Sequence, residues 1–470
     1  MFETIKNTAH YRWYVLATVS VGTFMSTLDS SIVNVALPTI SSQLHSDISI
    51  LQWVVTAYLL TISSLLPVFG RTADMFGRKK VYSLGFLIFI LGSLLCGFAD
   101  NIWFLVGSRV LQAVGASMLM SNSAAIITAI FPSNERGKAL GLTGTVVALG
   151  SLTGPALGGL LIGLTSWRSI FFINIPLGII GYLAARLILP NDESRKAQES
   201  FDFIGAITFT AGMISLLLGI NNGEDWGWTS LSVLFSLIIG LALLFVFFIN
   251  ERKTQHPLID LSLFSNRPFM IGNLSGWLSF VAMFANNMLL PFYLQHILNY
   301  TPSQVGLLMT VFPITMAIVA PISGHASDKF GPIVLTTSGL AITGLGLFYF
   351  STLSATAQFY QIIPGSILIG LGSGMFQSPN NSSVMSSVPP QKLGIAGGIN
   401  SLVRNLGMII GIAFSVSLFE ALGGVTKPNP DQISTFLSAY HSVMLVAMTI
   451  AFVGAIISLN RKSYAMAKNN

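Results

Sequence analysis

Apolar stretches about twenty residues long recur from one end of the chain to the other. An α-helix rises about 1.5 Å per residue, so roughly 20 apolar residues span the ~30 Å hydrocarbon core of a bilayer. A chain with so many such stretches is constrained to fold as a bundle of membrane helices. We expect fourteen helices, over residues 13–37, 50–69, 80–98, 103–122, 138–163, 169–189, 203–221, 229–249, 269–291, 303–323, 332–351, 357–379, 393–419 and 434–459.

The composition excludes the other common classes of protein. Only 9% of the 470 residues are charged and 52% are hydrophobic, whereas a soluble domain carries about 25% charged residues. So few charges cannot cover a water-facing surface, and the low charge also excludes disorder. The single cysteine, Cys96, excludes a disulfide scaffold. The first stretch is too long for a cleavable signal peptide and contains Asp29, so we expect it to remain as a helix.

Lysine and arginine gather on alternate connections between these stretches. With the amino terminus in the cytoplasm, nineteen of the 23 Lys and Arg residues fall on cytoplasmic segments, and two, Arg168 and Lys427, fall outside. Positive residues resist translocation, so this distribution fixes the orientation. The sequence therefore predicts a multi-pass protein of the cytoplasmic membrane with both termini inside the cell. The net charge of +6 reflects this orientation, and we assign it no nucleic-acid role.

Two connections repeat the pattern Gly-x-x-(small)-Asp-x-Phe-Gly. They lie at residues 70–77 and 324–331, which are 254 residues apart. This offset maps helices one to six onto nine to fourteen and leaves seven and eight without a counterpart. Internal repeats are typical of secondary transporters, whose substrate site lies between two halves. We therefore expect six-helix halves at residues 1–190 and 269–470, with an inserted helix pair at residues 191–268.

The repeated connection has two interpretations. In the first it is a tight cytoplasmic turn in which glycine relieves steric strain. In the second, which the duplication favours, Asp74 pairs with Arg78 and caps a helix of the other half, closing the cytoplasmic side. The candidate gating residues of the two connections are Gly70, Asp74, Gly77, Arg78 and Asp328.

With four further motifs, the chain resembles the major facilitator superfamily, specifically its fourteen-helix branch of drug:proton antiporters. The motifs are Leu-Asp-Ser-Ser-Ile-Val-Asn-Val-Ala-Leu-Pro at 28–38, Arg-Val-Leu-Gln-Ala-Val-Gly at 109–115, Gly-Ser-Leu-Thr-Gly-Pro-Ala-Leu-Gly-Gly at 150–159, and Trp167, Arg168, Phe171, Asn174 and Pro176. The resemblance covers nearly the whole chain and departs from the family pattern at Ala113, where glycine is usual. It implies an all-α fold of 6 + 2 + 6 transmembrane helices and export of amphiphilic drugs or dyes in exchange for protons.

Asp29 is the candidate proton carrier. It is the only one of seventeen acidic residues well inside an expected helix, where a carboxylate is costly and is by default a functional candidate. Asp29 lies about eight residues from the outer end of its helix and Arg109 about seven residues into the fourth, hence at similar depths of ~12 and ~10 Å. The resemblance implies that these two helices are neighbours. Arg109 then sets the proton affinity of Asp29; the alternative is a static buried pair that fixes helix packing.

The fifth expected helix carries a ridge of glycines. Gly150, Gly154 and Gly158 recur every four residues, beside Pro155 and Gly159. Such a ridge permits close approach of another backbone. It is interpreted either as generic small-residue packing, including a dimer seam, or as the bending helix that the resemblance assigns to antiporters.

Arg404 is the unusual residue of the second half, because no carboxylate lies well inside a helix there. Either Asn400, Asn405 or backbone carbonyls solvate it, or it contacts an anionic or zwitterionic group of the substrate. Aromatic, methionine and amide residues offer an adaptable pocket wall. The candidate wall residues are Phe24, Met25, Asn34, Trp53, Tyr58, Met118, Asn122, Trp277, Phe280, Met283, Phe284, Asn287, Phe312, Met316, Phe376, Gln377 and Asn380.

No motif indicates an enzyme, a metal site or a cofactor. The six histidines are scattered without metal-ligand spacing, and no phosphate-binding Gly-rich loop with Lys-Ser/Thr is present, so ATP is not the expected energy source. The partners that we expect are amphiphilic small molecules, protons and the bilayer. A lipid or glycolipid flippase on the same fold is the first alternative function, and a membrane-embedded enzyme or receptor is the second.

Overall fold

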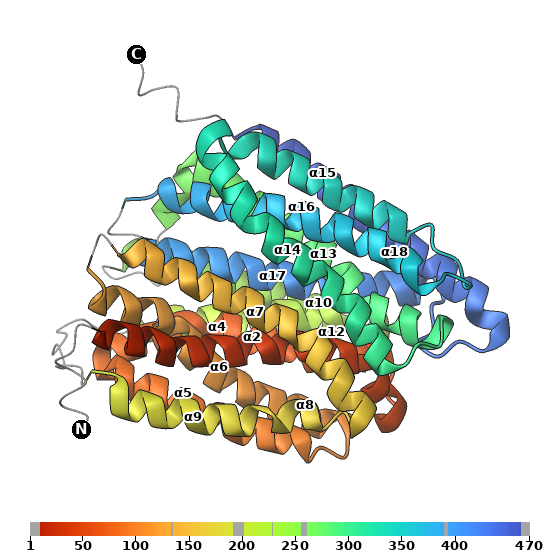
Figure 1. Cartoon of the computed structure of the whole chain (residues 1–470), viewed down its shortest axis with the longest axis horizontal. Helices are drawn as coiled ribbons and strands as arrows, with labels where there is room; N and C mark the ends of the chain where they lie inside the picture. The colour runs from red at the N-terminus through yellow and green to blue at the C-terminus, as the bar shows by residue number, and fades with distance from the viewer. Residues whose placement is uncertain are drawn as a thin grey trace. The chain divides into compact units, whose positions relative to one another are not determined.

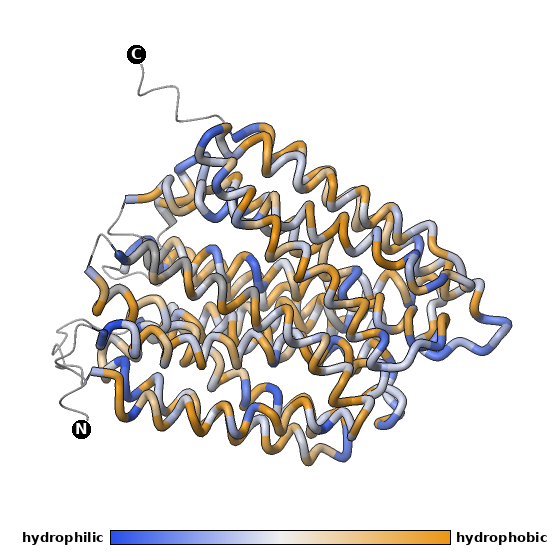
Figure 2. Tube along the Cα trace, viewed as in Figure 1, coloured by the Kyte–Doolittle hydropathy of each residue, from blue (hydrophilic) through white to orange (hydrophobic). Residues whose placement is uncertain are grey.

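The protein is described from a computed structural model that covers residues 10–132, 135–190, 202–227, 229–254, 261–389 and 393–461 (Figure 1). Every regular element in these ranges is helical, and no strand occurs among them. The predicted all-α polytopic fold is therefore confirmed. Along the long helices the chain is mainly hydrophobic, and hydrophilic residues gather toward helix ends and connections (Figure 2).

The chain divides into two compact units. Unit 1 comprises residues 1–46, 53–217 and 236–258, and unit 2 comprises residues 47–52, 218–235 and 259–470. Unit 1 holds α2 (Tyr11–Leu44), α4 (Trp53–Phe76), α5 (Arg78–Gly97), α6 (Ile102–Ile130), α7 (Arg136–Leu164), α8 (Ser169–Phe172), α9 (Asn174–Ile188) and most of α10 (Phe203–Asn221) and α12 (Leu231–Lys253). Unit 2 holds α3 (Ile48–Leu51), α11 (Gly223–Trp226), η1 (Leu261–Ser265), α13 (Arg267–Phe292), η2 (Tyr293–Ile297), α14 (Pro302–Phe330), α15 (Pro332–Phe350), α16 (Phe359–Ser386), α17 (Leu393–Ala421), η4 (Pro430–Gln432) and α18 (Ile433–Leu459).

Twelve helices of the described residues are long and apolar enough to cross a membrane, two fewer than expected. The two remaining expected positions are occupied by α7 and α10. Their apolar portions within the described residues, Leu149–Leu164 and Ile204–Ile220, are shorter. A multi-pass membrane protein follows from the other twelve alone.

The two units repeat the same helix pairings. In unit 1, α2 packs against α7 and α9, while α4 and α5 pack against α6. In unit 2, α13 packs against α17 and α18, while α14 and α15 pack against α16. These pairings correspond under the 254-residue offset of the two Gly-x-x-(small)-Asp-x-Phe-Gly connections. Helix α10 joins unit 1 through the hydroxyl of Thr210, which donates to the carbonyl of Ser64 in α4 at 3.3 Å.

The last glycine of each repeated connection has the same role. The N–H of Gly77 donates to the carbonyl of Ala73 and that of Gly331 to the carbonyl of Ser327, both at 2.9 Å. Both glycines have positive φ, 105° for Gly77 and 78° for Gly331, a conformation that L residues with a side chain rarely adopt. The glycines therefore end one helix and start the next at equivalent points of the repeat.

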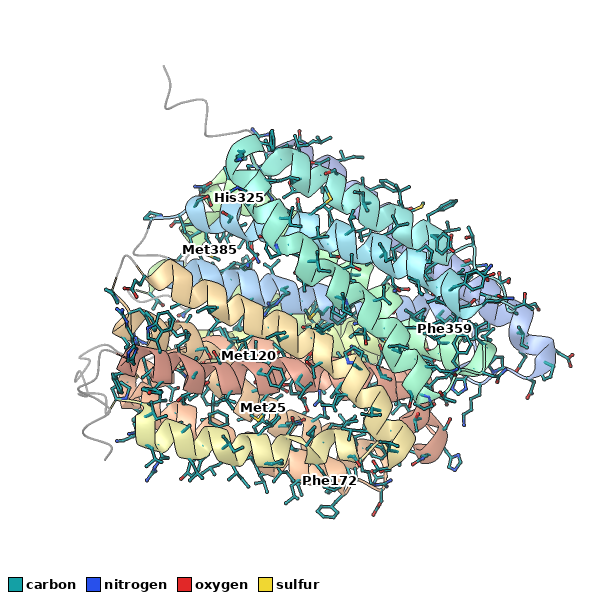
Figure 3. The ribbon with its side chains drawn as sticks, viewed as in Figure 1. Met25, Met120, Phe172, His325, Phe359 and Met385 are labelled. Atoms are coloured by element: carbon teal, nitrogen blue, oxygen red, sulfur yellow. The ribbon has the colours of Figure 1, made fainter. Side chains whose placement is uncertain are left out.

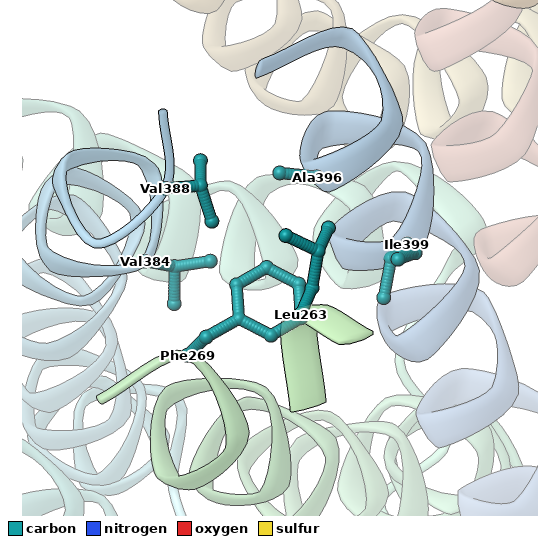
Figure 4. Close-up of a cluster of buried hydrophobic side chains, with 6 residues drawn as sticks. All are labelled: Leu263, Phe269, Val384, Val388, Ala396 and Ile399. Atoms are coloured by element: carbon teal, nitrogen blue, oxygen red, sulfur yellow. The ribbon is translucent and has the colours of Figure 1, made fainter. Parts of the chain in front are cut away.

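Apolar packing ties helices together at one end of unit 2. Phe269 of α13 lies among buried side chains of η1, α16 and α17 (Figure 4). Asn266 starts α13 by accepting from the N–H of Phe269 at 3.4 Å, and its amide donates to the carbonyl of Ser387 at 2.6 Å. The beginning of α13 is thereby fixed against the end of α16. The buried members of this cluster are Leu263, Phe269, Val384, Val388, Ala396 and Ile399.

Candidate functional site

Asp29 lies inside unit 1 with no solvent exposure. Its Oδ2 forms an ion pair with Nη1 of Arg109, whose helix α6 packs against α2. Arg109 is also fully buried. The structure thus brings the two residues into contact, and their roles in proton transfer stay predictions.

The second carboxylate oxygen of Asp29 is also occupied. Its Oδ1 accepts from Nε2 of Gln112 at 2.8 Å and from Nδ2 of Asn174 at 2.8 Å. Gln112 lies three residues beyond Arg109 on α6, so both side chains project from one face of that helix. Asn174 is the first residue of α9. Donors from two different helices therefore compensate the buried charge on Asp29.

Gln112 connects this centre to α5. Its Nε2 also lies 2.8 Å from the hydroxyl oxygen of Ser93, and its Oε1 accepts from Nη1 of Arg109 at 2.6 Å. A buried carboxamide that uses both ends in this way has a fixed orientation. Gln112 and Asn174 belong to motifs of the sequence but were not predicted as partners of Asp29. Their position near Asp29 depends on how α2, α6 and α9 pack together, which a single sequence does not specify.

Arg109 also contacts residues other than Asp29. Its Nε donates to the carbonyl of Val54 at 3.1 Å, and its guanidinium carbon lies 3.9 Å from the ring centroid of Tyr58. The ring of Phe171 is 5.8 Å away. A cation over an aromatic face is attracted by the ring quadrupole, most strongly where water is excluded. Unit 1 therefore stabilises the guanidinium through several contacts besides the ion pair.

The glycine ridge of α7 faces α2 beside Asp29. A methyl group on Gly150 would lie 2.2 Å from the hydroxyl oxygen of Thr27, and one on Gly154 would lie 1.9 Å from that of Ser31. The hydroxyl of Ser31 donates to the carbonyl of Gly150 at 3.2 Å. Gly158 approaches Ile32 in the same way. The ridge is thus a contact between helices of one unit, with Pro155 and Gly159 in the same helix.

The repeated connections contain two candidate gating residues, Asp74 and Asp328, whose side chains lie outside the described residues. The expected ion pair between Asp74 and Arg78 therefore stays a prediction. Arg78 donates to the carbonyl of Ala125 in α6 at 3.0 Å. Gly70 lies near Ser121 of the same helix, where an added methyl group would be 3.9 Å from its Cβ.

The candidate wall residues of unit 1 are mostly buried in that unit. Met25, labelled in Figure 3, is fully buried and lies near Gly178 of α9. Tyr58 belongs to the surroundings of Arg109, and the amide of Asn122 donates to the carbonyl of Met118 in its own helix at 2.8 Å. The other buried members are Asn34, Trp53 and Met118, whereas Phe24 is half-buried.

Five candidate residues of unit 2 meet around one cavity of about 30 Å³. These are Phe280, Phe376, Gln377, Asn380 and Arg404, and the cavity lining is completed by Gly276, Asn381, Asn400 and Val403. A volume of this size holds a few water molecules rather than a drug-sized ligand. Trp277 and Phe284 lie instead against glycines of α17, and Phe312 lies near Gly370 of α16. Asn287 and Met316 are half-buried, and Met283 is buried.

A second guanidinium lies behind this cavity. Arg461, which follows α18, is 2% exposed, and its Nη2 donates to Oδ1 of Asn380. The amide of Asn380 in turn donates to the carbonyl of Gly272 at 3.2 Å. Burial lowers the pKa of Arg461 to about 10, so its guanidinium remains charged at neutral pH. Neither the position nor the partner of Arg461 was predicted, because it lies beyond the last apolar stretch.

Known proteins resemble this chain over nearly its full length. Residues 19–203 and 272–468 match the profile of the Major Facilitator Superfamily. The riboflavin transporter RibZ of Clostridioides difficile (strain 630) is 38% identical over 451 residues, which are 95% of this chain and 97% of the relative. The multidrug resistance protein Stp of Mycobacterium tuberculosis (strain CDC 1551 / Oshkosh) is 33% identical and the match covers 94% and 83% of the two chains. For the multidrug transporter MdtP of Bacillus subtilis (strain 168), the identity is 30% and the covered shares are 88% and 76%.

The fold also matches a solved structure. A chain described under "Structural insights into substrate recognition in proton dependent oligopeptide transporters" superposes with a TM-score of 0.67, covering 96% of this chain and 98% of that chain. Its sequence identity is 16%, so the likeness concerns the fold alone. RibZ and MdtP are named as transporters, and the expectation that the chain is not an enzyme is confirmed. The chain therefore belongs to the Major Facilitator Superfamily.

Proposed function

We propose that this transporter is a proton-coupled antiporter that exports amphiphilic small molecules, such as drugs and dyes, across the cytoplasmic membrane by alternating access. The observation that carries the proposal is the fully buried carboxylate of Asp29, held by Arg109, Gln112 and Asn174. A static packing role needs no titratable group at such a depth, whereas proton exchange does.

Protonation of Asp29 removes the charge that its three donors compensate. The ion pair with Arg109 then weakens, and the guanidinium keeps the carbonyl of Val54, the oxygen of Gln112 and the ring of Tyr58. Because these partners remain, Arg109 can separate from Asp29 without losing all of its stabilising contacts. Asp29 has no solvent exposure in the structure, so proton exchange takes place in a conformation that opens this centre.

The proposed topology has fourteen membrane helices, with α7 and α10 added to the twelve. Both termini lie in the cytoplasm, and α10 and α12 are an insertion (191–268) between halves at 1–190 and 269–470. The family match supports this division, because it leaves out residues 204–271. The proposed gating elements are the two repeated connections and the glycine ridge of α7.

Relatives named as multidrug proteins support a broad substrate range. A relative named as a riboflavin transporter supports a second candidate, transport of riboflavin or a similar planar heteroaromatic compound. The two are separated by measuring riboflavin flux through its own fluorescence beside that of ethidium, in the same vesicles.

The proton step is tested in proteoliposomes with an imposed pH gradient. We expect Asp29→Asn to reduce gradient-driven ethidium transport by at least about tenfold, because an amide cannot carry the proton. Asp100→Asn is the matched control, since the Asp100 side chain is 91% exposed and only faces Arg168 at 3.4 Å. Both variants are to be compared at equal reconstituted amounts. Gradient-driven transport that survives Asp29→Asn undiminished would reject Asp29 as the carrier.

A further inference from the structure

We propose that the cavity of unit 2 binds the acidic group of an aromatic substrate, with the guanidinium of Arg404 as its counter-ion. This inference rests on the proposed transport function and adds organic anions and zwitterions to the amphiphiles that the protein transports. It is built from residues of unit 2 alone.

The first observation is the state of Arg404. Its Nε atom is buried and has no hydrogen-bond partner among the described residues. A guanidinium has five N–H donors in a planar fork that matches a carboxylate, phosphate or sulfonate. Leaving such donors unmatched away from water is costly. A bound acidic group would supply the missing acceptors.

The second observation is the charge around the cavity. Among the described residues, its lining contains one cation and no acidic residue. The buried Arg461, whose Nε and Nη1 atoms have no hydrogen-bond partner in the part of the chain that the structure describes, adds a second positive charge through its hydrogen bond to Asn380. Arg404 in the lining and Arg461 behind Asn380 favour an anion in this region, because a low-dielectric surrounding strengthens the interaction of a ligand charge with both.

The third observation is that uncharged carboxamide groups at the cavity can donate hydrogen bonds to a ligand. Asn400 donates to Oδ1 of Asn381 at 3.0 Å, which leaves the amide N–H groups of Asn381 for a ligand. Gln377 lines the same cavity with a further carboxamide. Asn380 has both ends engaged, by Arg461 and by the carbonyl of Gly272, and therefore fixes the wall.

The aromatic part of the proposed ligand follows from the remaining lining. Phe280 of α13 and Phe376 of α16 both border the cavity. The volume of about 30 Å³ suits the acidic group itself, so the rings of the substrate must lie beyond it, against apolar side chains. Pockets of this kind combine an apolar lining with a few placed polar groups.

Two probes of equal shape test the proposal with the purified full chain in detergent. They are 2-naphthoate and 2-naphthamide, which differ in charge and are both fluorescent. We expect the wild-type protein to bind naphthoate more tightly, and Arg404→Ala to weaken naphthoate binding about tenfold while changing naphthamide binding less than about twofold. Arg404→Lys should restore part of the affinity, since it keeps the charge and loses the planar fork. Arg186→Ala, which removes an exposed arginine of unit 1, is the control and should change neither.

A second variant keeps the test valid if Arg404→Ala fails to fold. A methyl group on Gly276 would lie 3.5 Å from Nδ2 of Asn380, an ordinary contact, while occupying part of the cavity. Gly276→Ala should therefore weaken naphthoate binding, and Gly107→Ala, whose methyl group meets no atom within 4 Å, should not. The proposal is overturned if wild-type protein binds the two probes equally, or if neither Arg404→Ala nor Gly276→Ala affects naphthoate selectively. No proton gradient is present in this binding experiment, so a defect in proton coupling leaves its results unchanged. Such a defect is measured separately, by gradient-driven transport of the Asp29→Asn variant in proteoliposomes.

Discussion

Asn174 donates a hydrogen bond of 2.8 Å to Oδ1 of Asp29, the oxygen that also accepts from Gln112. Asn174 is the first residue of α9 and follows the short helix α8. The donor therefore lies where the chain changes from one helix to the next, and its distance to the carboxylate depends on the position of the α9 start. A displacement of α9 would remove one of the three donors of Asp29 without breaking the ion pair.

We predict that Asn174→Ala reduces gradient-driven transport. The substitution removes one of the three donors that compensate the buried charge of Asp29, and we expect the initial rate of transport to fall severalfold. The rate is measured in proteoliposomes with an imposed pH gradient. Asn222→Ala is the control, because the amide of Asn222 donates to the carbonyl of Leu218 in α10 at 2.9 Å. An unchanged rate for Asn174→Ala would mean that this hydrogen bond does not act on transport.

Tyr58 offers a matched pair of substitutions. Its hydroxyl is buried without a partner among the described residues, whereas its ring lies 3.9 Å from the guanidinium carbon of Arg109. Tyr58→Phe keeps the ring and should transport at nearly the wild-type rate. Tyr58→Leu removes the cation–π contact, worth about 1–2 kcal/mol where water is excluded, and should reduce transport severalfold. Equal activity of the two variants would argue against a role for the ring.

The contact between α2 and α7 predicts a large effect of a single methyl group. In Gly154→Ala the new Cβ would lie 1.9 Å from the hydroxyl oxygen of Ser31 and 2.9 Å from the backbone nitrogen of Ile32. The helices must separate, and we expect the free energy of unfolding to fall by about 1–3 kcal/mol. Thermal unfolding of the detergent-solubilised protein measures the change against Gly107→Ala, whose methyl group meets open space. Comparable melting temperatures for the two variants would contradict this account of the ridge.

The repeated connections predict matched effects in the two units. Gly77→Ala and Gly331→Ala place a side chain at φ values of 105° and 78°, respectively. Each substitution should cost about 1–3 kcal/mol of strain. Gly398→Ala, in a helix with open space around it, is the control. Stability is measured for each variant by thermal unfolding, and a loss in only one of the two would show that the connections are not equivalent.

Much of the fold was predictable because membrane helices follow from local composition. Each long apolar stretch must satisfy its own backbone hydrogen bonds in the bilayer, so its length and hydropathy identify it without knowledge of its neighbours. The buried contact between Asp29 and Arg109 was also accessible, because the two charges lie at similar depths and the resemblance to the major facilitator superfamily implies that their helices are neighbours. The twelve-helix count differs from fourteen at α7 and α10, where the described apolar portions are short.

The rest depends on packing that a single sequence does not specify. Nothing in the types of Gln112 and Asn174 indicates a role. Only the packing of α6 and α9 against α2 places them beside Asp29. Arg461 lies beyond the last apolar stretch, and only the course of the chain after α18 places it beside Asn380. Similarly, the sequence identified Met25 by its side-chain type, whereas the structure buries it against α9.

The close approach of α7 to α2 has a mechanical consequence. The ridge glycines pack directly on Ser31 and Ile32 of α2, so α7 has no side chain there whose rotation could absorb a displacement. A bend of α7 would therefore be transmitted to α2, and α2 carries the buried acid.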